Sequence, residues 1–205
     1  MLTLQDAGSY WRYCLSIEQM LNKTTDYVEI CSNNSSTYSF EYAKIIMLAC
    51  SELDVMFRLL CKEIDSGLDF ENSSTRSGNI ALYAQTILPK FPKITTFALK
   101  EDRSLLDFIP FSNWCLSPYS SPSWWDDYQK VKHYRHSEFM RATQDNALNA
   151  VAGLITLNFY LYRQIANQPY ANPPHPSSHM FSSAVFAPMM RFRADEELPD
   201  FMVTP

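Results

Sequence analysis

Residues 39–65 constrain the fold more than any other segment, because they are apolar around most of a helical circumference. Two stripes of apolar residues run side by side at helical spacing. The first is Ile45, Leu48, Ala49, Leu53, Met56 and Leu60, and the second is Met47, Cys50, Phe57 and Cys61. A helix that is apolar on most sides must be enclosed by other elements. The sequence therefore predicts a central helix here, with Ser39 as its N-cap and Glu41 in its first turn.

Three further segments have helical periodicity. Residues 6–24 place apolar side chains on one face, and residues 79–88 predict a short helix that ends at Pro89. A helix over 123–135 is predicted to start at a capping signature formed by Ser123 and Asp126, to bend near residues 136–137, and to resume until about residue 166. Its second part has a core face made of Leu148, Val151, Ala152, Ile155, Phe159 and Tyr162.

The chain has only four glycines in 205 residues, which argues against a fold built from many tight hairpins. One small hairpin is predicted from residues 94–100 and 105–111, and residues 117–123 are predicted to be a loop. The same scarcity removes the Gly-rich loops that cradle phosphates. The expected fold class is mainly α: a helical bundle of four to five helices with a small inserted β-hairpin and a Pro-rich C-terminal tail.

The predicted organisation is a helical domain over 1–166, with the hairpin inserted at about 94–111, followed by a Pro-rich linker and C-terminal extension over 167–205. The last 25 residues could add one strand or lie extended over the surface. Residues 147–162 are strongly apolar, but Asn149 and Asn158 interrupt them, which favours a core helix over a membrane span. No signal peptide is recognised, so a cytoplasmic protein without membrane contact is expected. The five cysteines include no CxxC pair, and buried reduced thiols are predicted.

The stretch 124–141, WWDDYQKVKHYRHSEFMR, has the greatest concentration of chemically useful side chains, in a chain of net charge -5. We define its basic cluster as Lys130, Lys132, His133, Arg135, His136 and Arg141. These residue types can hold and cleave an RNA phosphodiester, since cations stabilise developing negative charge and histidine transfers protons near neutral pH. His133, Arg135 and His136 are the candidate catalytic residues, and Lys130, Lys132 and Arg141 the candidate substrate-binding residues. The alternative is a solvated basic helix face.

Glu52 and Asp54 lie on the apolar stripes of the 39–65 helix, where a carboxylate needs a partner. We predict that one of them contacts Lys132, Arg135 or a histidine and orients the basic cluster. A metal site built from His133 and His136 with these carboxylates is a weaker alternative, and no cofactor or metal is expected. His175 and His179 are expected to be solvated. Trp124 and Trp125 could stack on bases, but core packing or a dimer seam is the more common role of such residues.

Two stretches resemble a bacterial family within the HEPN superfamily of helical nucleic-acid-processing domains. The first is YSFEYAK at 38–44 with SELD at 51–54, and the second runs from Trp124 through KHYR at 132–135 to Phe139, Ala142 and NALNAVAGL at 146–154. The resemblance implies a bundle of about four helices, homodimerisation, and metal-independent RNase activity linked to toxin or phage-defence systems. It also implies a site formed by Glu52 or Asp54 with Arg135 and a nearby histidine.

The sequence departs from that family at one position of its motif. Active members have an arginine followed by four to six residues and then a histidine, and no arginine in this chain has a histidine at that spacing. Lys130 and His136 have the spacing, but lysine does not bind phosphate in the bidentate manner of arginine. Two hypotheses therefore stay open. One is an RNA-directed protein that could cleave RNA, and the other is a non-catalytic interaction or dimerisation module whose basic cluster is a structural ion-pair network.

Overall fold

The computed structural model describes residues 2–68, 70, 79–166 and 174–183. Within these ranges the chain is mainly helical, with small antiparallel sheets, as the sequence predicts. The five α-helices are α1 (Leu4–Thr24), α2 (Phe40–Ile64), α3 (Ile80–Lys90), α4 (Ser123–Glu138) and α5 (Gln144–Ala166). The strand predicted as possible within residues 181–205 is present as β5 (Phe181–Ser182), and the other predictions for 167–173 and 184–205 lie outside the described residues.

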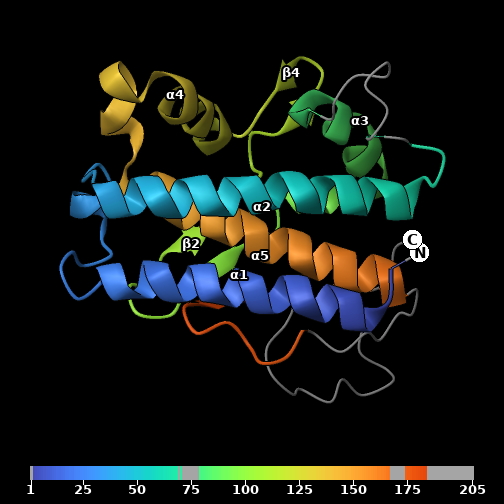
Figure 1. Cartoon of the computed structure of the whole chain (residues 1–205), viewed down its shortest axis with the longest axis horizontal. Coiled ribbons are helices and arrows are strands. Elements are labelled where there is room, and N and C mark those ends of the chain that lie inside the picture. Colours follow the sequence, from blue (N-terminus) through green and yellow to red (C-terminus); the bar gives the residue numbers. More distant parts are fainter. Residues whose placement is uncertain (1, 69, 71–78, 167–173, 184–205) are drawn as a thin grey trace.

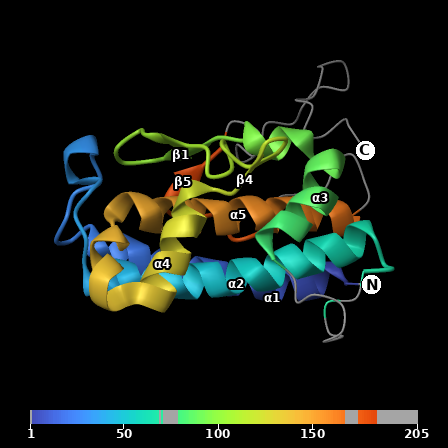
Figure 2. The ribbon, with the colours of Figure 1, turned by 90° about the horizontal axis from the view of Figure 1, so that it is seen from above.

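Helices α1, α2 and α5 lie side by side along the long axis, and α3 and α4 cover the outer side of α2 (Figures 1 and 2). The central position predicted for 39–65 is confirmed, since α2 packs against all four other helices. Helix α5 is enclosed even more fully, and every residue from 150 to 161 is buried. Its interior polar groups bond within the helix: Thr156 Oγ1 donates to the carbonyl of Ala152 and Asn158 Nδ2 to that of Leu154, both at 2.9 Å.

The helix ends follow local capping chemistry. Ser39 is the N-cap of α2, as predicted, and its hydroxyl accepts from the Tyr42 amide at 3.0 Å. The capping role predicted for Ser123 is wrong. The N-cap of α4 is Pro122, and the Asp126 carboxylate accepts from the hydroxyl of Ser121 at 2.6 Å.

The predicted end of α3 at residue 88, before Pro89, is two residues early. Helix α3 continues to Lys90 because the Phe91 amide donates to the carbonyl of Ile87 at 2.8 Å, which closes the last turn around the proline.

The predicted hairpin exists, but its strands are shorter than expected. Strand β1 (Leu99–Glu101) pairs antiparallel with β2 (Asp107–Phe108) and, on its other edge, with β5 (Phe181–Ser182). The start of the first predicted strand is instead a 3-10 turn, η2 (Pro92–Thr95). A second pair, β3 (Cys115–Leu116) with β4 (Tyr119–Ser120), lies partly inside the segment predicted to be a loop.

Residues 174–183 return along α1 and are held there by buried polar contacts. Trp11 Nε1 donates to the carbonyl of Pro176 at 2.7 Å. The carboxylate of Glu18, which has no exposed surface, accepts from the amides of His179 and Met180 at 3.1 and 3.0 Å and from the hydroxyl of Ser178. These donors replace the water that a buried carboxylate loses. His175 and His179 are exposed, as expected.

The helix predicted to resume after the bend and run to residue 166 is interrupted. Helix α4 is kinked at Tyr134 (φ -131°, ψ 33°), a 3-10 turn η3 (Phe139–Arg141) follows it, and α5 starts only at Gln144. The reason is a long-range pairing of the segments that precede α2 and α5. The Ser39 amide donates to the carbonyl of Ala142 at 3.2 Å, and the Gln144 amide donates to that of Thr37 at 2.8 Å.

Both neighbouring tryptophans of α4 are buried, which confirms core packing for Trp124 and Trp125. Trp124 Nε1 donates to the carbonyl of Pro110 at 2.6 Å, and its ring lies against Phe111. A Cβ atom added at Gly153 of α5 would lie 3.1 Å from Trp124 Cζ2. A glycine is required at this position because α5 and the indole approach each other so closely.

The predicted buried thiols are confirmed for Cys14, Cys50 and Cys61, which are free and enclosed. Burial raises the pKa of the Cys61 thiol to about 12 and that of Cys14 and Cys50 well above the usual range. In the described part of the chain, none of the helices is long and apolar enough to cross a membrane.

The two helical glycines make a matched test of this packing. Replacing Gly8 of α1 by alanine adds a Cβ only at ordinary contact distance from the Tyr162 hydroxyl, 3.4 Å, so G8A should stabilise the protein by up to about 1 kcal/mol through helix propensity. The same change at Gly153 should destabilise it, because overpacking costs about 1–3 kcal/mol. Urea denaturation measures both free energies of unfolding, and equal stabilisation by the two variants would contradict the packing assigned to Trp124.

Candidate functional site

An open groove of about 1160 Å³ lies between the first half of α2 and the second half of α4. We call it the α2–α4 groove. Its floor is apolar and consists of Met20, Ala43, Met47, Leu48 and Val131. Its rim carries Lys44, Lys132, His133, Arg135 and His136, and two aromatic rings, Phe40 and Phe139, close one end.

The structure thus brings together four of the six residues of the basic cluster, Lys132, His133, Arg135 and His136, on one groove. All four side chains are exposed. Lys132 Nζ lies 5.5 Å from the centre of the Tyr128 ring, a cation–π distance. Within the described residues, Arg135 and the two histidines form no ion pair with a carboxylate, so their charges or protons are available to a ligand.

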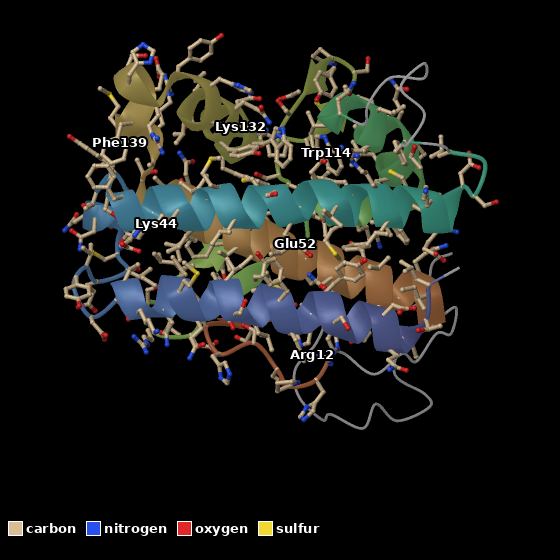
Figure 3. All side chains as sticks on the ribbon, in the orientation of Figure 1. Arg12, Lys44, Glu52, Trp114, Lys132 and Phe139 are labelled. Carbon is tan, nitrogen blue, oxygen red and sulfur yellow. The ribbon has the colours of Figure 1, made fainter. Side chains whose placement is uncertain are left out.

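The kink in α4 determines how these side chains are presented. Lys132 and His133 precede the non-helical residue Tyr134, and Arg135 and His136 follow it. The helix is therefore not regular across these residues, yet residues on both sides of the kink line the same groove. The opposite wall is the start of α2, which contributes Lys44, labelled with Lys132 and Phe139 in Figure 3.

The other two residues of the basic cluster do not line the groove and are engaged in internal ion pairs. Arg141 Nη1 donates to Asp127 Oδ1 at 2.7 Å, and Arg141 Nε donates to Glu138. Lys130 Nζ lies 3.7 Å from the same Asp127 oxygen. The second oxygen of Asp127 accepts from Asn146 Nδ2 of α5 at 3.1 Å. For these two cations the structural ion-pair hypothesis describes the arrangement: Arg141 joins η3 to α4, Lys130 pairs within α4, and the Asn146 bond ties Asp127 of α4 to α5.

The predicted contact of Asp54 with the basic cluster is wrong. Asp54 pairs with Arg58 one helical turn further along, Nη2 to Oδ2 at 2.7 Å, and accepts from the Tyr83 hydroxyl of α3 at 2.8 Å. Arg58 Nε also donates to that hydroxyl at 3.1 Å. Burial, together with the Asp54 carboxylate, raises the pKa of Tyr83 and keeps it a donor. Asp54 therefore joins α2 to α3, because a local arginine satisfies it first.

The predicted contact of Glu52 is also wrong. Glu52 lies on the side of α2 that faces α1 and α5, whereas Lys132 lies across α2 (Figure 3). Its carboxylate adds to the electrostatic field that raises the pKa of the buried Cys14 thiol of α1. Partial burial raises the pKa of Glu52 itself. In the described part of the chain no carboxylate lines the groove, and neither Glu52 nor Asp54 orients its histidines.

Three groove features were not predicted from the sequence. Lys44 joins the rim from α2, and Phe40 and Phe139 contact each other with their ring centres 4.7 Å apart. Tyr38 lies edge-on to Phe139 at 5.6 Å, just outside the groove. The sequence marks these residues only weakly. They are aromatic or basic residues near the start or end of a helix, and they belong to none of the predicted core faces. Among the described residues, no group of three His, Cys, Asp or Glu side chains could hold a metal ion.

Comparison of the chain with known protein families, with curated proteins and with solved structures found no match in any of the three.

Asp127 is the residue through which the ion pairs can be tested. D127A removes the acceptor of Arg141 and of Asn146 together. It should lower the free energy of unfolding by about 1 kcal/mol, mainly through the lost Asn146 hydrogen bond, because an ion pair with the partly exposed Arg141 contributes little. The adjacent D126A is the matched control, since Asp126 is exposed and accepts from Ser121 alone within the described structure; it should cost less. Thermal and urea unfolding measure both. If D127A were no more destabilising than D126A, the network would not tie α4 to α5.

Proposed function

We propose that this protein is an RNA-directed protein that holds single-stranded RNA in the α2–α4 groove. The observation that carries the proposal is the charge of the rim. Among the described residues, five basic side chains and no carboxylate line one groove of a chain whose net charge is -5; one of the five, Lys44, also pairs with the exposed Glu41 at 2.6 Å. A local basic surface on an acidic protein attracts an anionic ligand to that place, because phosphate contacts supply most of the non-specific binding energy for nucleic acids.

The geometry favours a single strand as the ligand. The groove is bounded by two helices and its floor is apolar, so an extended strand can place phosphates against the rim cations and its bases against the floor and the aromatic end. Lys44 on α2 and Arg135 on α4 would hold the backbone from opposite walls.

The proposal extends to cleavage of the bound RNA. The groove offers His133 and His136 as proton donors and acceptors and Arg135 or Lys132 as the cation for the charge that develops on the phosphate. With no carboxylate in the lining, the two histidines would perform acid–base catalysis without an orienting acid. The resemblance to HEPN proteins points to the same metal-independent chemistry, although the expected arginine-to-histidine spacing is missing.

Binding can be tested through its salt dependence. Fluorescence anisotropy with a labelled single-stranded RNA should show affinity falling steeply as salt rises from about 50 to 200 mM. R135A and K44A should each lower the slope of log K against log salt by about 0.7, the value for one phosphate contact on a single strand.

Arg12 provides the control for this experiment. It is exposed on α1, on the side of the molecule away from α4 (Figure 3). R12A should leave both affinity and slope unchanged. An equal effect of R12A and R135A would mean that RNA binds to the protein without using the groove.

Cleavage is tested with the histidines. H133A and H136A should each reduce the rate of RNA cleavage by about 100-fold or more, since general acid–base catalysis contributes at least that much. The reaction is followed with a chelator present, and circular dichroism verifies the fold. His179, exposed and outside the groove, is the matched control. Undiminished cleavage in H133A and H136A would refute the catalytic assignment and leave binding alone.

A second function is favoured by the ion pairs of Arg141 and Lys130 and by the apolar floor of the groove. In that case the protein is a non-catalytic interaction or dimerisation module, and the groove accepts a helix of a partner or of a second copy. Absence of RNA binding at low salt, together with a concentration-dependent dimer in sedimentation, would support this function over the first.

A further inference from the structure

We infer that Tyr38, Phe40 and Phe139 form a base-stacking platform that makes the α2–α4 groove selective for unpaired nucleotides. The inference rests on the proposed binding of RNA and deepens it by naming the ligand class. The three residues are defined here as the aromatic platform. Tyr38 precedes α2, Phe40 is the first residue of α2, and Phe139 is the first residue of the turn η3. Phe40 and Phe139 line the groove.

The rings of the platform are held together at fixed geometry. Phe139 lies in the middle, 4.7 Å from Phe40 at an interplanar angle of 35° and 5.6 Å from Tyr38 at 88°. The backbone bonds between residues 35–39 and 142–145 fix both segments, because they include an amide donated from Ser39 to Ala142. Tyr38 also forms an isolated β-bridge with Thr143. The platform is therefore built before any ligand arrives.

Two of the three platform rings are largely exposed, and Phe139 is half-buried against the core. Phe40 is 72% exposed and Tyr38 is 53% exposed, whereas Trp124 and Trp125 of the same region are buried in the core. Large apolar side chains grouped on a surface mark an interaction site, because burying them would be favourable. Folding alone does not account for a Phe with most of its surface in water at the N-terminal turn of α2.

The neighbours of the platform indicate which ligand it takes. Lys44 lies one helical turn after Phe40, and Arg135 and His136 lie just before Phe139 in the chain; all three line the same groove. Planar rings beside cations match a nucleotide, whose base stacks on an aromatic face while its phosphate meets the positive charge. A paired base is already stacked within its duplex and cannot reach the platform, so an unpaired nucleotide is the ligand that fits.

The experiment compares two ligands of equal charge. One is a labelled single-stranded RNA, and the other is the same strand with abasic residues in place of its nucleotides, which keeps the phosphates and removes the bases. Wild-type protein should bind the complete strand about tenfold or more tightly than the abasic strand, since stacking contributes that much per base. F40A should lose this preference, and F40W should retain it. Phe40 is largely exposed, so its replacement should leave the fold intact.

The control is Y13A, because Tyr13 is an exposed aromatic residue of α1 outside the groove. It should behave as wild type. If the complete strand binds with the expected salt slope but F40A keeps the preference for bases, the platform is refuted and the proposed RNA binding stands. If neither strand binds at low salt, the proposed function fails as well. If the wild-type protein binds no RNA but forms a dimer that F40A cannot form, the platform is a contact surface for a second copy of the chain.

Discussion

The backbone pairing between residues 35–39 and 142–145 is the constraint on which the rest of the structure depends. It joins the chain just before α2 to the chain just before α5, so these two central helices start together and run in the same direction (Figure 1). The amides of Gln144 and Asp145 at the start of α5 have no partner within their helix and are satisfied by carbonyls of Thr37 and Ser35. The same pairing fixes the positions of Phe40 and Phe139, and so closes one end of the groove.

The two halves of α4 have different roles: the first half packs into the core, and the second half lines the groove. The first turns of α4 carry Trp124, which packs against Phe111 and Gly153, and Trp125, which packs against Phe57 of α2. The following turns, residues 132–137, have only exposed side chains. One short helix is therefore anchored at its start and presents cations at its end. The kink at Tyr134 lets this second part leave the bundle and form a wall of the groove.

The sequence predicted the helices well where apolar periodicity was strong, as in α1, α2 and the core face of α5. It failed at details that apolar periodicity does not specify, such as the residue that caps a helix and the partner of a charged side chain. Ser123 has the chemistry of an N-cap, but the chain path places Pro122 at that position. Asp54 needed a partner, as expected, yet Arg58 on the same helix and Tyr83 of α3 provide it. The sequence identifies the basic cluster as a group. It does not show that four of its residues line the groove and that the other two form internal ion pairs.

The sequence alone determined that the chain is a helical bundle around residues 39–65 and that its basic side chains gather in one segment, because both follow from local spacing and composition. Only the tertiary structure decided which of those side chains share a groove. That depends on the kink of α4 and on contacts between residues about a hundred positions apart, such as Tyr38 with Phe139 and Thr37 with Gln144. Contacts of this kind leave no periodic signal in the sequence, because the two partners are far apart in the chain and meet only in the folded structure.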